Sequence, residues 1–72
     1  GEGVGEFLMR SLIAAATERG AKKMTLEVRK SNYVAQNLYS KLGFEPIGIR
    51  RGYYLDDRED AVIMLKDLVP GT

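Results

Sequence analysis

Residues 27–44 read EVRKSNYVAQNLYSKLGF, and this stretch decides the fold because a strand ends in it and a helix follows. Just before and inside it, Met24, Leu26 and Val28 alternate with polar residues. This two-residue period predicts a strand with one apolar and one polar face. Glu27 belongs to the polar face, so its carboxylate should point away from the apolar side chains.

The helix that follows is predicted over residues 34–42, where apolar side chains recur at helical spacing. Ser31 and Asn32 precede it, and both are good N-caps because their side-chain oxygens can accept a hydrogen bond from a free backbone N–H group. Gly43 ends the helical pattern. The stretch therefore supplies a strand, a turn and a short helix in succession.

Outward from this unit, residues 6–19 show the pattern of an amphipathic helix, with Gly20 as its C-terminal cap. The apolar stripe of this helix consists of Phe7, Leu8, Leu12, Ile13, Ala15 and Ala16. Downstream, residues 47–54 and 61–65 are predicted strands around a polar turn at 55–60, and the last three residues form a loose end. The predicted order is helix, strand, helix, strand, strand, which is an α/β chain.

The chain has 72 residues, of which 44% are hydrophobic and 29% charged, as is ordinary for one small globular domain. A chain of this length buries only about 60% of the surface of its unfolded form, so its stability margin is thin. It has no Cys and no His, which excludes disulfides, a zinc site, a Cys nucleophile and a Ser-His-Asp triad within it. The net charge of +1 gives no basic face for nucleic acid, and no apolar run is long enough for a membrane span. We expect a soluble, cytoplasmic protein with no nucleic-acid or membrane partner.

Two features indicate that part of the domain lies elsewhere. The chain begins with Gly1 inside a glycine-rich segment, so we expect the natural start to lie upstream. The strand at residues 24–28 also needs a neighbour, because a helical crossover usually returns to a parallel strand of the same sheet. An unpaired strand edge favours association, so a homodimer is one way to complete the sheet.

The segment GEGVG at residues 1–5 runs into the first helix. Glycines at a helix N-terminus let backbone N–H groups approach phosphate oxygens, and the helix dipole favours an anion there. The pattern G-x-G is a weak motif, and a flexible terminus before a helix is the ordinary alternative.

Three side chains of the central stretch also have ordinary explanations. Glu27 on a polar strand face is usually a solvated carboxylate or an ion-pair partner. Asn32 is explained as a helix N-cap, and Tyr39 as a core aromatic on the apolar stripe of its helix. Judged one at a time, these structural roles are preferred over catalytic ones.

The combination of LEVR at residues 26–29, Asn32, and LYSKLGF at residues 38–44 changes this balance. With the N-terminal glycines, these motifs resemble the GNAT superfamily of acyl-CoA N-acyltransferases, and within it the RimI-type enzymes that acetylate protein N-termini. The resemblance extends over essentially the whole chain. It implies a GNAT-type α/β fold with a mixed sheet, of which residues 1–72 would be the C-terminal, cofactor-binding and catalytic half.

The resemblance also implies site residues. Glu27 would be the general base for the incoming amine, directly or through water, and Tyr39 would protonate the departing thiolate. Acetyl-CoA would be the co-substrate, with no metal ion, and its pantetheine arm would bind to Asn32. The segment implied to hold the pyrophosphate consists of Gly1, Glu2, Gly3, Val4 and Gly5. The family pattern has a basic or amide residue just before these glycines, and here that position precedes the chain.

Tyr53 and Tyr54 alone would be amphipathic rings on an edge strand. The resemblance implies that this pair lines the groove for the acceptor, a protein N-terminus such as that of a ribosomal protein. Three alternatives remain open: transfer to a lysine, transfer to a small-molecule amine, or a half-domain that self-associates and binds CoA without turnover.

Overall fold

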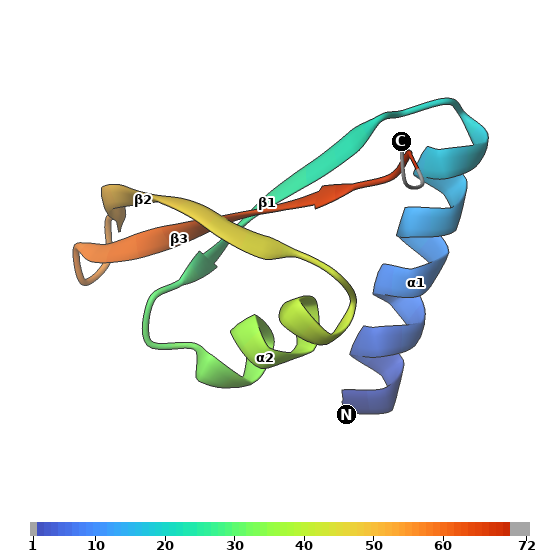
Figure 1. Cartoon of the computed structure of the whole chain (residues 1–72). Coiled ribbons are helices and arrows are strands. Elements are labelled where there is room, and N and C mark those ends of the chain that lie inside the picture. The colour runs from blue at the N-terminus through green and yellow to red at the C-terminus, as the bar shows by residue number, and fades with distance from the viewer. Residues whose placement is uncertain (1, 70–72) are drawn as a thin grey trace.

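The computed structural model describes residues 2–69; Gly1 and the predicted loose end at residues 70–72 lie outside the described residues. Two helices and three strands follow one another in the predicted order, which is confirmed (Figure 1). Their bounds are α1 Glu2–Glu18, β1 Lys23–Arg29, α2 Tyr33–Lys41, β2 Glu45–Tyr54 and β3 Glu59–Asp67. Neither of these two helices is long and apolar enough to cross a membrane.

Helix α1 begins four residues earlier than predicted, at Glu2 instead of Glu6. The prediction of a glycine loop before the helix is therefore wrong, because Gly3 and Gly5 lie in its first turns. Glycine disfavours a helix by up to about 1 kcal/mol, which led to the later start. A Cβ atom at Gly5 would lie 4.0 Å from Leu38 Cδ2, an ordinary van der Waals distance, so Gly5 faces α2 at a position where a small side chain would also fit.

The sheet has the strand order β1-β3-β2, and both pairs are antiparallel. β1 pairs with β3 along its whole length, with Glu27 opposite Ile63 and Val28 opposite Val62. β3 of the same chain thus gives β1 an antiparallel neighbour on one edge, and a parallel neighbour on the other edge stays a prediction. Within residues 2–69 the other edge of β1 has no strand beside it, as expected.

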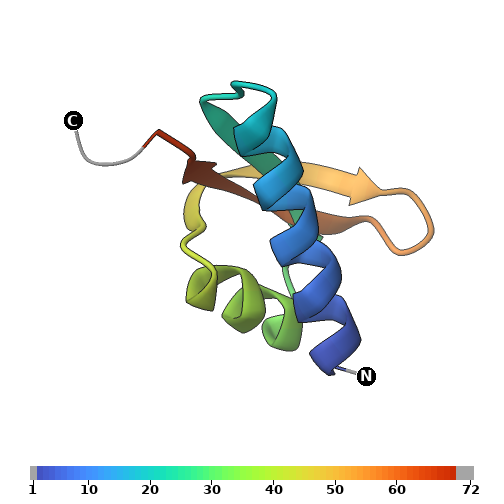
Figure 2. The ribbon, with the colours of Figure 1, turned by 90° about the vertical axis from the view of Figure 1, so that its right-hand side faces the viewer.

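Five buried side chains form the core between the sheet and the helices: Val28, Leu42, Phe44, Val62 and Met64. Partly buried residues of both helices and of β1 pack against them: Met9, Ile13, Met24, Leu26, Ala35, Leu38 and Tyr39. Both helices therefore contact the same face of the sheet. Figures 1 and 2 show α1 and α2 side by side, with the β2–β3 turn at the end of the sheet farthest from α1.

Only part of the apolar stripe predicted for α1 reaches this core. Ile13 packs against it, whereas Phe7 and Leu12 are 69% and 56% exposed. The stripe is wider than the surface that the sheet and α2 offer, so α1 uses one edge of it. Met9, which the predicted stripe did not include, lies on the contacting edge.

Candidate functional site

The junction between β1 and α2 is held by side-chain hydrogen bonds. The Asn32 Oδ1 atom accepts a bond of 3.1 Å from the backbone N–H of Ala35, so Asn32 is the N-cap of α2 as predicted. Gln36 donates from its amide nitrogen to the carbonyl oxygens of Arg29 and Lys30, at 3.2 and 2.8 Å. These bonds fix the course of the loop. The Asn32 amide nitrogen makes no hydrogen bond within the described part of the chain, so it can donate to a ligand.

Glu27 lies on the face of the sheet away from the helices, because it alternates with the core residue Val28. Its Oε1 atom is 3.7 Å from Nη2 of Arg50, which reaches across β3 from β2. The carboxylate is therefore an exposed ion-pair partner in this structure.

Tyr39 lies on the opposite, helix-covered side of the sheet. Its ring packs edge-on against Phe44, with centroids 5.9 Å apart and the planes at 60°, and it borders the core. The structure thus separates Tyr39 from Glu27 by the sheet. A molecule in contact with both would have to lie along the free edge of β1.

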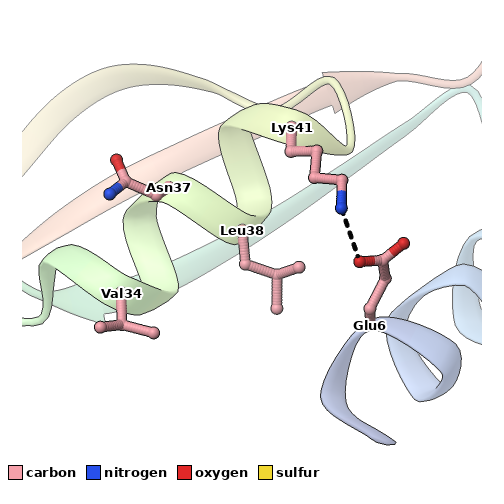
Figure 3. A pocket seen from close by; sticks show the side chains of 5 residues that line it. All are labelled: Glu6, Val34, Asn37, Leu38 and Lys41. Carbon is pink, nitrogen blue, oxygen red and sulfur yellow. Dashed lines mark hydrogen bonds and ion pairs between the residues drawn. The ribbon is translucent and has the colours of Figure 1, made fainter. Parts of the chain in front are cut away.

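A cavity of about 270 Å³ opens between α1 and α2 (Figure 3). The residues that line it are Glu6, Val34, Asn37, Leu38 and Lys41. Lys41 Nζ lies 3.0 Å from Glu6 Oε1, and Arg10 pairs with the other oxygen of the same carboxylate at 3.0 Å. These bonds, from Lys41 first and then from Arg10, hold the pKa of Glu6 below its usual value. The cavity is slightly smaller than typical ligand pockets, which span roughly 300–1,000 Å³, so it can hold only part of a large cofactor.

The first turn of α1, where the glycines lie, directly precedes Glu6, which lines this cavity. The leading N–H groups of a helix have no carbonyl partners within it, and the helix dipole makes this end positive. No heavy atom lies within 4 Å of the place where a Cβ of Gly3 would be, so the backbone is open on that side. This region suits a phosphate group joined to a partly apolar arm. It combines free N–H donors, the Lys41 ammonium and the apolar side chains of Val34 and Leu38.

Arg29, at the end of β1, binds the turn between β2 and β3. Its Nη2 atom contacts both carboxylate oxygens of Asp56 at 2.9 and 3.0 Å, and its Nη1 atom lies 2.8 Å from Asp57 and 3.6 Å from Glu59. The hydrogen bond from Arg29 holds the pKa of Asp56 below its usual value, and the Asp56 and Asp57 carboxylates, Asp56 first, raise the pKa of the guanidinium. Hydrogen bonds from Ser31 are the main cause of the lowered pKa of Glu59.

The two tyrosines predicted to line the acceptor groove are in contact. The rings of Tyr53 and Tyr54 meet edge to face, with centroids 5.0 Å apart and the planes at 88°. The Arg29 guanidinium lies 4.0 Å above the Tyr54 ring, and that of Arg50 lies 5.3 Å above the Tyr53 ring. Since Arg50 also pairs with Glu27, one series of contacts runs from Glu27 to the turn.

The sequence did not reveal the roles of Arg29 and Lys41, although both belong to the motifs that carry the resemblance. Their partners are 27 and 35 positions away in the chain, and no local spacing identifies such pairs. Within residues 2–69, no three carboxylate side chains are grouped so as to hold a metal ion.

Known proteins resemble this chain in sequence and in structure. A model of the acetyltransferase (GNAT) family matches residues 1–44. The ribosomal protein bS18-alanine N-acetyltransferase of Escherichia coli (strain K12) is 48% identical over 65 residues, which are 88% of this chain and 44% of that protein.

Two solved structures have the same arrangement of elements. The crystal structure of the ribosomal-protein-S18-alanine N-acetyltransferase from Escherichia coli matches 97% of this chain and 46% of its own, with a TM-score of 0.85 and 43% identity. A chain of the NatC complex bound to Gag peptide and CoA matches 96% of this chain and 43% of its own, with a TM-score of 0.89 and 28% identity. The chain thus spans less than half the length of these relatives. The family match and the shared fold confirm the resemblance seen in the sequence: the chain belongs to the acetyltransferase (GNAT) family.

Proposed function

We propose that residues 1–72 form the cofactor-binding and catalytic part of an N-acetyltransferase that transfers an acetyl group from acetyl-CoA to the N-terminal α-amino group of a protein. The cavity between α1 and α2, with Lys41 at its wall and Asn32 as the N-cap of α2, is the observation that carries this proposal. The similarity to an enzyme named for its action on ribosomal protein bS18 supports a ribosomal protein as the acceptor, and hence a reaction in the cytoplasm.

In this proposal the pyrophosphate of acetyl-CoA lies at the first turn of α1, within residues 1–5. Lys41 attracts it, and Arg10 keeps the Glu6 carboxylate neutralised if Lys41 turns toward the phosphate. The pantetheine arm passes Asn32, whose amide nitrogen donates to one of its carbonyl groups. CoA bound in the NatC complex supports this choice of cofactor.

The acetyl group then lies at the free edge of β1, between the two sheet faces. The neutral amine attacks the thioester carbon, a C–N bond forms, and Glu27 accepts a proton from the amine. The C–S bond breaks as Tyr39 gives its proton to the thiolate. A free α-amino group has a pKa of about 7.7–8.0 against about 10.4 for lysine. An N-terminal ammonium can therefore be deprotonated by a weaker base than a lysine ammonium can. A carboxylate such as Glu27 suffices for it.

A second candidate is a half-domain that binds CoA and self-associates without turnover. The exposure of Phe7 and Leu12 on α1 and the free edge of β1 favour it, because both are surfaces that association would cover. Acetylation of lysine or of a small-molecule amine is a variant of the first candidate and depends on the acceptor groove.

The test is transfer of radiolabelled acetyl from acetyl-CoA to a peptide with a free N-terminal alanine, and to the same peptide with a blocked N-terminus and an internal lysine. We expect label only on the free N-terminus. Glu27→Gln and Tyr39→Phe should each lower kcat by about 100-fold or more, as removal of a general base or acid does. Glu45→Gln is the matched control on exposed strand β2, and its kcat should stay within about twofold.

Binding of acetyl-CoA is measured on the same samples by isothermal titration calorimetry. Binding without transfer to any acceptor would support the non-catalytic half-domain. If neither substitution changes the rate of transfer, the chain is an acetyltransferase but Glu27 and Tyr39 are not its general base and acid.

A further inference from the structure

The loop after β1 and the turn between β2 and β3 are far apart in sequence and joined in space. At the start of β3, directly after the turn, the carbonyl oxygen of Asp60 accepts from the backbone N–H of Lys30 at 3.0 Å, and the Glu59 carboxylate accepts from the N–H of Ser31. The loop carries Asn32, the proposed cofactor contact. The turn directly follows Tyr54, one of the proposed acceptor contacts.

Arg29 contributes more hydrogen bonds to this connection than either backbone N–H group does. Its guanidinium uses both terminal nitrogens on the turn: Nη2 donates to the two carboxylate oxygens of Asp56, and Nη1 donates to Asp57. A planar fork that binds two carboxylates can hold them in one orientation only, unlike the point charge of a lysine. The flat face of the same guanidinium covers the Tyr54 ring at 4.0 Å.

We propose that Arg29 is a positioning residue for the transfer reaction: it fixes the β2–β3 turn, and with it Tyr53 and Tyr54, relative to the loop that carries Asn32. The effect of Arg29 on the reaction rests on the proposed function. Its effect on the position of the turn rests on the contacts alone. Arg29 touches neither proposed reactant, so it acts through the tyrosines. Loss of Arg29 should weaken binding of the acceptor and leave binding of the cofactor unchanged.

The backbone of the turn reports this role directly. In the wild-type chain, NMR order parameters of amides 53–58 should be close to the value of about 0.85 for rigid backbone. In Arg29→Lys, which keeps the charge and loses the fork, they should fall below about 0.6, and exchange of the Ser31 amide with solvent should rise at least about tenfold. The amides of Leu26 and Met64, inside the β1–β3 ladder, should not change. Arg19→Lys, in the turn that follows α1, is the matched control.

A second variant removes the partners and leaves the strand intact. Asp56→Asn combined with Asp57→Asn should loosen the same amides, since two neutral amides replace the charged acceptors. An unchanged turn in both variants would overturn the proposal. Equal loosening of the turn and of the β1–β3 ladder would also overturn it, because Arg29 would then support the whole fold.

Kinetics then test the catalytic consequence. Arg29→Lys should raise the KM for the acceptor peptide about tenfold and leave kcat and the affinity for acetyl-CoA within about twofold. An unchanged acceptor KM with a loosened turn would refute the link from Arg29 to the tyrosines. If the wild-type chain transfers no acetyl group, the proposed function fails for this chain, and the NMR comparison still decides whether Arg29 fixes the turn.

Discussion

Asn32 shows how one side chain can serve both structure and binding. Its amide has an acceptor end and a donor end, and the structure uses only the acceptor, as the cap of α2. Ser31 and Asn32 are both possible caps by sequence, and a cofactor contact that occupied Asn32 would leave the cap to Ser31. The geometry makes that exchange unnecessary, because the two ends of one amide can act at once.

This division of roles predicts different results for two substitutions. Asn32→Asp keeps a cap oxygen and loses the N–H donor, so the free energy of unfolding should be unchanged within about 0.5 kcal/mol while acetyl-CoA binding weakens about tenfold. Asn32→Ala should lose both the binding and about 1 kcal/mol of stability, the usual cost of an N-cap. Urea unfolding and calorimetric titration measure the two quantities. Wild-type affinity in Asn32→Asp would show that Asn32 is a cap only.

At the scale of elements, the sequence predicted what depends on local chemistry. The alternation in β1, the cap and glycine stop of α2, and the polar turn before β3 are short-range signals, and the structure confirms these elements. The predicted start of α1 was wrong by four residues because the low helix propensity of glycine was taken to exclude Gly3 and Gly5 from the helix.

Pairing between elements was harder to predict. The antiparallel partner of β1, and the carboxylates that Arg29 and Lys41 bind, come from distant parts of the chain. Periodicity carries no information about them. The candidate site was therefore predicted residue by residue, whereas its connections come only from the structure.

The connection through Arg29 should depend on pH. The folded-state pKa values of Asp56 and Glu59 lie below their usual values, so their contribution is complete above about pH 4–5 and is lost as the pH falls through the lowered values. The guanidinium stays charged throughout. We expect the order parameters of the turn to be constant from pH 7 to about 5 and to fall below about pH 4.

Arg29→Met is the control for this titration. Its turn should be loose at every pH and lack the acid transition that Asp56 contributes, and any change that remains would belong to the Ser31–Glu59 hydrogen bond or to the other ion pairs. Among these is the Glu6–Lys41 pair between the helices, where the pKa of Glu6 is also lowered. An acid transition of equal size in Arg29→Met would mean that Arg29 is not the partner responsible.

At the scale of the whole molecule, the thin stability margin expected from 72 residues is visible in the distribution of apolar side chains. The core has few fully buried members, and α1 carries Val4, Phe7, Leu8 and Leu12 on surface that the described residues leave exposed. A chain with this surface has two ways to cover it: contact with a further segment, or contact with a second copy. Both would involve the same face of α1.

Two adjacent residues of α1 decide whether that face is covered in solution. Ile13 packs against the core and Leu12 is 56% exposed. In a monomer, Ile13→Ala should cost about 1–2 kcal/mol, less than the 2–5 kcal/mol for a fully buried side chain, and Leu12→Ala should cost less than about 0.5 kcal/mol. Urea unfolding at low and at tenfold higher protein concentration, with light scattering on the same samples, measures both costs. If Leu12→Ala costs as much as Ile13→Ala, and only at the higher concentration, then the exposed face of α1 is a contact between copies. A difference between the two variants that is independent of concentration would establish that α1 is stabilised by one face alone, as it is in this structure.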